Sequence, residues 1–444
     1  MKSDFDRLMA ERVLDGLIVT GPSHANPAMY YMINGAHVGE ATTVIKKRDE
    51  APVIFANSME RDEAAKSGLR VVDRSQYDPL KILNEEKGDR LRARARLTAM
   101  MLDELGVKGR VAVYGREEQG EAFALWHQLM ALRNDIQIVG EYGDTVFNRA
   151  YYTKDADEVA RIRAVGEKTM IVVGNTWDFL ASHRAADGVL VKDDGTPLTV
   201  GDVKREIRGW IREQELEAPE DFIFAIGRDA GVPHSRGEDS SPIALGQTIV
   251  YDIFPREAGS GYYFDFTRTW CVGFAPPDVE KAFREVLEIF NITSDAMHPG
   301  TPCANYQKMT NDYFEARGHP TMRTNPQTTE GYVHSLGHGV GLNIHEGPSL
   351  SEYEGNTDIL EPGVAITVEP GLYYPDKGFG VRIEDFLWLN PKTLTLETIG
   401  EFPKDLVIPL KKAGGRRSSL RSGAGEKKKG TGGKGRGTKK REKK

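Results

Sequence analysis

The feature that most constrains this chain is a set of carboxylates placed inside strand-like apolar segments. Asp252 interrupts the segment 248–254 (TIVYDIF), and Asp265 interrupts the segment 262–270 (YYFDFTRTW). Glu369 and Glu384 lie in two similar segments further along the chain, VAITVEP and GVRIEDFLW. Buried and unpaired, each carboxylate would cost several kcal/mol or would have to bind a proton. Cations are the natural partners of such a set.

The first two carboxylates fit a hairpin. Turn-forming residues fill the segment 255–261 (PREAGSG) between the two strands. A hairpin centred between Ala258 and Gly259 would place Asp252 directly opposite Asp265. Cross-strand Cβ atoms are roughly 4.5–5.5 Å apart, which suits two carboxylates that share metal ions about 3.5–4 Å apart.

The second pair repeats this arrangement. The turn 374–378 (YPDKG) separates the two strands. Pairing centred between Asp376 and Lys377 would place Glu369 opposite Glu384. The sequence therefore predicts two carboxylate pairs on two hairpins, although a bulge of one residue would change either register.

A nitrogen ligand is available in the glycine-rich segment 334–346 (HSLGHGVGLNIHE), which contains His334, His338 and His345. Glycine lets the backbone approach a ligand closely. Four carboxylates and one imidazole balance two divalent ions in charge. The donor set is rich in oxygen and has no thiolate, so manganese, iron, cobalt and zinc all fit it. Cys271 is expected to be a core residue.

The rest of the chain predicts an α+β protein. Residues 1–150 have the pattern of an α/β unit, with strands at 15–20, 52–56 and 110–114 and a helix over 89–105. This unit is expected to serve as a scaffold, to gate substrate or to dimerise. A second unit, 151–410, contains two helices, strands, two more helices and strands, which suggests a duplicated half-unit. The first helix of the second unit begins near residue 153, and the next begins after Thr199, a plausible N-cap.

The last part of the chain, 411–444, has a different composition. It contains 15 Lys and Arg against 2 Asp and Glu, a net charge of +13 that leaves −20 on the rest of a chain whose total is −7. Such a segment cannot bury a core and is expected to be disordered. It could contact nucleic acid or an anionic surface, although it has no aromatic residues for base stacking.

The compartment is inferred from what the sequence lacks. The chain has two cysteines, no apolar run near 20 residues and no secretory signal pattern at its start. We therefore expect a cytoplasmic protein without a membrane span.

These residues resemble a known family, the pita-bread metallopeptidases, which include methionine aminopeptidases, Xaa-Pro aminopeptidases and prolidases. The family pattern of Asp, Asp, His, Glu and Glu falls in order on residues 252, 265, 338, 369 and 384. The resemblance spans about 153–409. It implies a C-terminal pita-bread fold, a pseudo-twofold antiparallel sheet with covering helices, after a creatinase-like N-terminal domain.

The flanking residues resemble the Xaa-Pro branch. His334 precedes His338 by four residues, the segment 231–234 (GVPH) matches the upstream substrate histidine His234, and Arg382 precedes Ile383 and Glu384. The resemblance implies an Xaa-Pro aminopeptidase that removes the N-terminal residue through water activated by two divalent metal ions. It also implies a homodimer that acts on peptides.

The resemblance also assigns roles. The metal ligands would be Asp252, Asp265, His338, Glu369 and Glu384, with Asp265 and Glu384 bridging two ions. Glu369 would act as the base, and His234, His334 and His345 would bind substrate and stabilise the oxyanion. Arg382 would hold a substrate carboxylate. Manganese is the first expectation for the metal, followed by cobalt, zinc or iron.

Some features depart from the family pattern. The Asp252-to-Asp265 loop is two residues longer than usual, Phe254 and Pro255 replace a more usual glycine, and the basic tail is not a family feature. A prolidase-type Xaa-Pro dipeptidase is therefore the alternative. Three further alternatives rank lower: a creatinase-type enzyme, a non-catalytic pita-bread binding protein, and a nucleic-acid-binding protein in which the tail is the active part.

Overall fold

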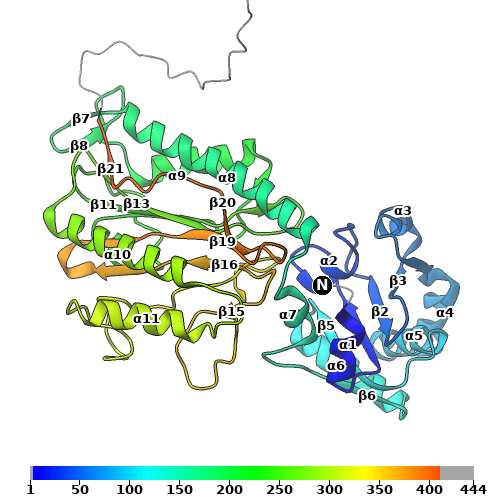
Figure 1. The fold of residues 1–444 in the computed structure, drawn as a ribbon. Coiled ribbons are helices and arrows are strands. Elements are labelled where there is room, and N and C mark those ends of the chain that lie inside the picture. Colours follow the sequence, from blue (N-terminus) through cyan, green and yellow to red (C-terminus); the bar gives the residue numbers. More distant parts are fainter. Residues whose placement is uncertain (1–3, 411–444) are drawn as a thin grey trace, which may run out of the picture. The chain divides into compact units, whose positions relative to one another are not determined.

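A six-stranded sheet organises the first part of the chain in the computed structural model, which describes residues 4–410 (Figure 1). Its strand order is β4-β3-β2-β1-β5-β6. The strands are β1 (Gly16–Thr20), β2 (Thr43–Lys47), β3 (Val53–Ala56), β4 (Arg70–Asp73), β5 (Gly109–Gly115) and β6 (Ile136–Val139). The three strands predicted from the sequence are therefore confirmed as β1, β3 and β5.

Helices flank this sheet. They are α1 (Phe5–Glu11), α2 (Pro27–Met32), α3 (Arg61–Ala65), α4 (Pro79–Glu85), α5 (Arg90–Glu104), α6 (Gln119–Leu132) and α7 (Val146–Tyr151). In β1, Leu17 and Val19 belong to one apolar cluster and Ile18 to another, so this strand is buried on both faces. A strand covered on both faces needs the uninterrupted apolar run that the sequence has here.

Two capped helices begin the second part of the chain. They are α8 (Ala156–Ser182) and α9 (Val200–Glu213). The side chain of Thr199 accepts a hydrogen bond from the backbone of Asp202 in a capping box, which confirms the predicted N-cap. Asp155 and Glu158 form the same motif at the start of α8.

The strands of this part form two principal sheets. One has the order β10-β11-β13-β21 and the other the order β15-β14-β16-β19-β20. Along the chain, a first set of strands between residues 184 and 272 comprises β7 (Arg184–Ala186), β8 (Val189–Val191), β9 (Leu216–Glu217), β10 (Ile223–Ile226), β11 (Thr248–Ile253), β12 (Arg256–Glu257) and β13 (Phe266–Val272). A second set, after residue 337, comprises β14 (His338–Gly339), β15 (Glu346–Ser349), β16 (Ala365–Val368), β17 (Gly371–Tyr374), β18 (Phe379–Arg382), β19 (Asp385–Leu389), β20 (Leu396–Ile399) and β21 (Val407–Ile408), the last of which joins the first sheet.

Two further helices precede the second set of strands. They are α10 (Pro277–Ala296) and α11 (Ala304–Glu315), close to the ranges expected from the sequence. Figure 1 shows α8 and α9 on one side of the strands and α10 and α11 on another. The succession of two helices and strands thus occurs twice, as the sequence suggested.

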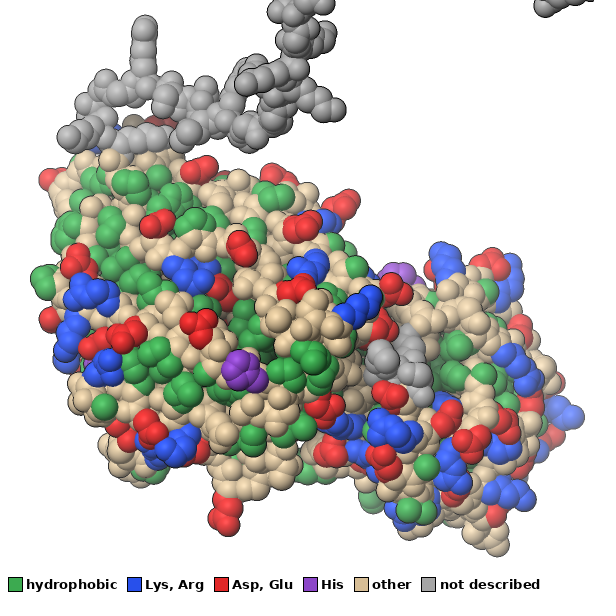
Figure 2. Space-filling model, viewed as in Figure 1, with side chains coloured by type: hydrophobic (Ala, Val, Ile, Leu, Met, Phe, Trp, Pro, Cys, Tyr) green, Lys and Arg blue, Asp and Glu red, His purple; other side chains and the backbone are tan. Residues whose placement is uncertain are grey.

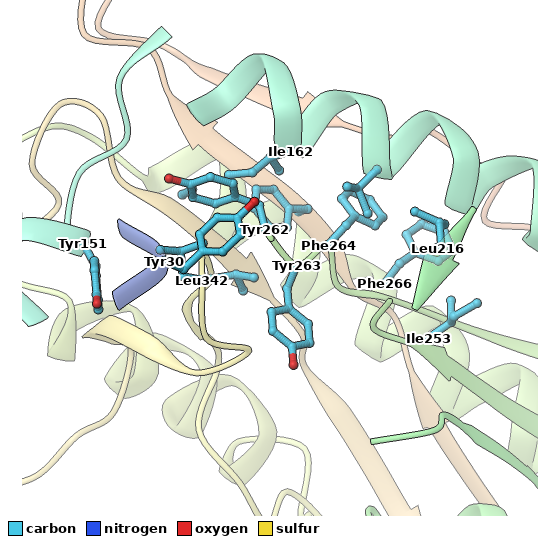
Figure 3. Close-up of a cluster of buried hydrophobic side chains, with 14 of the residues drawn as sticks. Tyr30, Tyr151, Ile162, Leu216, Ile253, Tyr262, Tyr263, Phe264, Phe266 and Leu342 are labelled. Carbon is cyan, nitrogen blue, oxygen red and sulfur yellow. The ribbon is translucent and has the colours of Figure 1, made fainter. Parts of the chain in front are cut away.

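Side chains of the β11–β13 hairpin alternate between core and cavity. Phe264 and Phe266 pack in an apolar cluster with Ile253 and with Ile162 of α8 (Figure 3). Successive side chains of an extended chain point to opposite faces. Asp265, between the two phenylalanines, is therefore directed away from this cluster.

Other features of the described residues are ordinary. Cys271 and Cys303 are free and buried, which confirms the expectation that Cys271 is a core residue. No helix among residues 4–410 is long and apolar enough to cross a membrane. Acidic and basic side chains intermingle on the face drawn in Figure 2. The predicted boundary near residue 150 stays a prediction, and the predicted basic tail lies outside the described residues.

Candidate metal centre and substrate cavity

One cavity of about 470 Å³ brings together residues from distant parts of the chain. All the site residues singled out from the sequence line it: His234, Asp252, Asp265, His334, His338, His345, Glu369, Arg382 and Glu384. Cavities of this size are typical of small-molecule sites. Because all nine predicted site residues line this one cavity, it is the candidate functional site.

The first hairpin brings its two carboxylates to this cavity in a register that differs from the prediction. Asp252 pairs with Thr267, two residues beyond Asp265. The turn is centred on Gly259 and Ser260, whose φ angles are +83° and +81°. Positive φ at both central residues is typical of a tight hairpin turn. Because a shift of two residues preserves the face, both aspartates still point to the cavity.

The second hairpin has the predicted register. Val368 pairs with Asp385 in one sheet, and Gly371 pairs with Arg382 in the β17–β18 ribbon. Both pairs belong to the register that sets Glu369 opposite Glu384. The turn between them is a short 3-10 segment, Pro375–Lys377, that ends at Gly378 with φ +76°.

Thr267 joins the two hairpins. The backbone N–H of Glu384 donates to the Thr267 carbonyl at 3.1 Å, and the Thr267 hydroxyl donates to Glu384 Oε2 at 2.7 Å. This contact connects residues that are 117 positions apart. It fixes the distance between the carboxylates of the two halves.

His338 has the orientation of a ligand. Its Nδ1 lies 3.1 Å from the carbonyl of Gly339, so in the neutral ring Nδ1 carries the proton. Nε2 then presents a lone pair towards Asp265 Oδ2 at 3.7 Å and Glu369 Oε1 at 3.5 Å. Burial lowers the pKa of His338 to about 3, so the ring is neutral at pH 7. A neutral imidazole held by a backbone carbonyl is the form that binds metals.

Burial raises the pKa of all four carboxyl groups above their ordinary values. For Asp265 and Glu384, the negative charges of neighbouring carboxylates raise it further. Glu369 reaches a pKa of about 8. The guanidinium of Arg382 opposes the shift at each of the four. One guanidinium cannot neutralise four carboxylates, so ionisation of all four requires further positive charge in the cavity.

The residues present fit divalent metal ions. Ligand atoms of Asp265, His338 and Glu384 all lie within 4.8 Å of one another. The Oδ1 atoms of Asp252 and Asp265 are buried and have no hydrogen-bond partner among the described residues. Buried carboxylate oxygens without donors are positions that a cation would satisfy. Oxygen atoms with one imidazole suit several divalent metals.

Arg382 is buried and points into this cluster. It donates from Nη2 to Asp252 Oδ2 at 2.5 Å, from Nε to the Thr267 hydroxyl at 3.2 Å and from Nη1 to Tyr373 Oη at 3.0 Å. Arg382 is therefore not part of a surface ion pair. Its guanidinium is largely occupied by the protein itself.

The three remaining histidines differ in their surroundings. His234 is exposed at the edge of the cavity, and the ring of His345 lies edge-on to that of His338, with centroids 4.3 Å apart. His334 is engaged at both nitrogens: Nδ1 with the Ser335 carbonyl at 2.7 Å and Nε2 with Tyr373 Oη at 2.9 Å. Only the first two histidines have ring nitrogens that no described residue binds.

Two residues of the site, Thr267 and Tyr373, were not predicted from the sequence. Thr267 follows Asp265 by two positions, and side chains two positions apart in a strand lie on the same face. The strand pattern could therefore have predicted that Thr267 lies beside Asp265 in the site. Tyr373 connects Arg382 to His334, and nothing in its sequence surroundings indicates this.

Four carboxylates and an imidazole that line one cavity on a duplicated helix-and-sheet scaffold fit a metal centre. The model of metallopeptidase family M24 matches residues 167–391, half of the chain. The chain belongs to this family. The resemblance to pita-bread metallopeptidases stated from the sequence is thereby confirmed.

Curated relatives agree with this family. An uncharacterized peptidase, YqhT, of Bacillus subtilis is 31% identical over 207 residues, 46% of this chain and 54% of that protein. A Xaa-Pro dipeptidase of Pyrococcus furiosus is 34% identical over 165 residues, 37% of this chain and 43% of that protein. The chain thus spans about half the length of the first curated relatives that it matches.

Solved structures extend the likeness over nearly the whole fold. An X-Pro aminopeptidase from Thermotoga maritima has a TM-score of 0.69 at 21% identity, covering 90% of this chain and 99% of that one. A Xaa-Pro dipeptidase from Bacillus anthracis has a TM-score of 0.71 at 22% identity, covering 91% and 99%. The predicted α+β fold, with an N-terminal domain before a pita-bread domain, is confirmed.

Proposed function

We propose that this protein hydrolyses the peptide bond that precedes proline, as an Xaa-Pro aminopeptidase that uses two divalent metal ions. The observation that carries the proposal is the convergence of Asp252, Asp265, His338, Glu369 and Glu384 on one cavity, with unpartnered carboxylate oxygens inside it. The relatives named as Xaa-Pro peptidases support the substrate class.

The five residues would hold the metals. When bound, such ions act as Lewis acids that activate water and polarise the scissile carbonyl. Thr267 holds the Glu384 carboxylate, and the Gly339 carbonyl holds the His338 ring in its ligand tautomer. These contacts fix the donor atoms before any metal or substrate arrives.

Proton transfer is proposed for Glu369. Of the four carboxylates it is the most accessible, and it lines the cavity where substrate would enter. It would take a proton from the attacking water and deliver it to the leaving nitrogen of proline, which has no proton of its own. The nitrogen must be protonated before the product can leave.

The histidines would act on substrate. His345 and His234 have ring nitrogens free of described partners, and we propose that they donate hydrogen bonds to the scissile carbonyl oxygen as it becomes negative. His334 can reach substrate only by breaking one of its two hydrogen bonds, so we propose that it positions Tyr373 and, through it, Arg382.

A prolidase-type dipeptidase is the second candidate, since relatives from two Pyrococcus species are named Xaa-Pro dipeptidases. A non-catalytic binding protein on this fold ranks lower because all five ligand positions are retained. Manganese as the metal, a homodimer and a cytoplasmic location also stay proposals.

The test is turnover of three substrates after reconstitution with Mn²⁺: an Xaa-Pro dipeptide, an Xaa-Pro tripeptide and a Met-Ala peptide. We expect hydrolysis of the proline substrates and little of Met-Ala. Asp265→Asn should lower kcat by more than the roughly 10–100-fold that follows loss of a partner of a metal ligand, because it changes a proposed ligand itself. Full activity of Asp265→Asn would refute the two-metal site, and preferred cleavage of Met-Ala would refute the Xaa-Pro assignment.

A further inference from the structure

A second cavity, of about 930 Å³, adjoins the metal cavity. The two share Glu220 and Arg236 in their linings. Nothing in the proposed reaction at the metal centre uses the second cavity. Its position beside the catalytic residues makes it a path for parts of a substrate that extend beyond the scissile bond.

Arginines dominate the wall of this cavity. Arg205, Arg208 and Arg212 come from α9 at spacings of three and four residues, which places them on one face of the helix. Arg236 and Arg256 add two more guanidinium groups, against three carboxylates in the lining, Glu217, Glu220 and Asp221. The lining also includes the apolar residues Ile211 and Leu216.

Three of the five arginines are paired within the protein. Arg256 contacts Glu217 at 3.1 Å, Arg208 contacts Asp221 at 2.8 Å, and Arg205 is paired with Asp202. Arg212 and Arg236 have no carboxylate partner among the described residues, and both are exposed. Two guanidinium groups are therefore available to a ligand, and guanidinium binds carboxylate through two parallel hydrogen bonds.

Glu220 determines where in this space an anion can lie. It is exposed, lines both cavities and has no cationic partner among the described residues. Burial lowers the pKa of His345, and the negative charge of Glu220 opposes this shift to a smaller extent. A carboxylate close to the metal cavity would be repelled by Glu220, whereas one further along α9 would meet Arg212.

We propose that the second cavity binds the C-terminal carboxylate of Xaa-Pro peptides longer than two residues, with Arg212 as its principal contact. This inference rests on the proposed Xaa-Pro function and adds the substrate length. In an Xaa-Pro dipeptide the only carboxylate is on proline itself, next to the scissile bond. Each further residue carries the carboxylate up to about 3.3–3.6 Å away from the metal centre and towards α9.

The test compares Ala-Pro-Ala-Ala with its C-terminal amide, and both with Ala-Pro, on the Mn²⁺-loaded full chain. We expect the tetrapeptide acid to have a KM about fivefold lower than the amide, as for one partly exposed ion pair. Arg212→Gln should bring the two KM values together, and Arg212→Lys should keep part of the difference. Arg284→Gln, an exposed arginine of α10 outside the cavity, is the matched control.

The possible outcomes separate this inference from the function on which it rests. Equal KM values for acid and amide in the unaltered protein, or an unchanged ratio in Arg212→Gln, would overturn the carboxylate site and leave Xaa-Pro hydrolysis standing. Turnover of Ala-Pro alone would overturn it in favour of a dipeptidase. Failure to cleave any of the three would refute the proposed function and, with it, this inference.

Discussion

Thr267 is fully buried at the centre of the site and contacts both hairpins. Its hydroxyl donates to Glu384 Oε2 and accepts from Arg382 Nε. It thus places one donor beside a proposed metal ligand and one acceptor beside the guanidinium that faces the carboxylates. This one hydroxyl provides hydrogen-bond partners for two buried charged groups, the Glu384 carboxylate and the Arg382 guanidinium.

Thr267→Val removes this hydroxyl with almost no change of shape. We expect a loss of about 1–3 kcal/mol in the free energy of unfolding, because two buried polar groups lose a partner. Affinity for Mn²⁺ should fall by about 10–100-fold, as when the partner of a metal ligand is removed. Denaturant unfolding and calorimetric titration with Mn²⁺ measure the two effects.

The control is Thr310→Val in α11, where the hydroxyl of an equally buried threonine donates to the carbonyl of Tyr306 and, among residues 4–410, to no other group. This variant can lose stability but should keep the affinity for Mn²⁺. If Thr267→Val bound Mn²⁺ as tightly as the control, Thr267 would have no part in orienting the ligands.

At the scale of elements, a buried ion pair ties the start of α8 to β15. Lys154 Nζ lies 2.7 Å from Glu346 Oε2, and both side chains are almost fully buried. Glu346 Oε1 accepts a hydrogen bond from the backbone of Asn343 at 2.8 Å. The pair therefore holds the loop that carries His345, which precedes Glu346 directly.

Lys154→Met should cost about 3–5 kcal/mol of folding stability, because it leaves the Glu346 carboxylate buried without its cation. Adding Glu346→Gln should recover part of this loss, since the amide oxygen can still accept from Asn343. Denaturant unfolding of both single variants and the double variant measures the coupling. Purely additive losses would show that the two side chains do not interact.

The two hairpins show how much of the site could be predicted from the sequence. In the second, proline and glycine confine the turn to 375–378, and the predicted register is confirmed. In the first, several residues of the segment 255–261 could form the turn, and the prediction missed by two positions. The carboxylates still met because strand alternation has a period of two.

Contacts between residues far apart in the chain could not be predicted from local sequence patterns. Lys154 and Glu346 are 192 residues apart, and neither residue lies in a pattern that indicates the other. The same is true of Tyr373, whose hydroxyl joins Arg382 to His334. Local periodicity predicts which face of an element is buried, whereas the fold decides which two elements meet.

At the scale of the whole molecule, removing metal should change how stability depends on pH. Without cations, burial raises the pKa of Glu369 from 4.5 to about 8, so the folded protein keeps a proton that the unfolded chain releases. The contribution of this group is therefore fully present below pH 4.5 and is lost as the pH rises through 8. The raised pKa values of Asp265 and Glu384 act in the same direction.

The buried histidines act in the opposite sense at lower pH. Burial lowers the pKa of His334 and of His338 from 6.5 to about 3, so stability rises with pH until the unfolded chain loses these protons near 6.5. Asp202, with a pKa lowered to about 2, is ionised throughout this range. The carboxylates thus dominate the slope between pH 6.5 and 8.

We therefore expect the Tm of the metal-free protein to fall from pH 6.5 to 8, and the gain in Tm on adding Mn²⁺ to be larger at pH 8 than at pH 6.5. Cations compete with protons for the same oxygens, so Mn²⁺ binds more tightly and stabilises the folded state more at pH 8, where fewer of these carboxyl groups hold a proton. Calorimetry in EDTA and in Mn²⁺ at both pH values measures this. Asp265→Asn, which removes one of the crowded charges, should flatten the metal-free slope. A metal-free Tm that rises over this interval would show that the four carboxylates do not share the buried cluster from which the metal site is inferred.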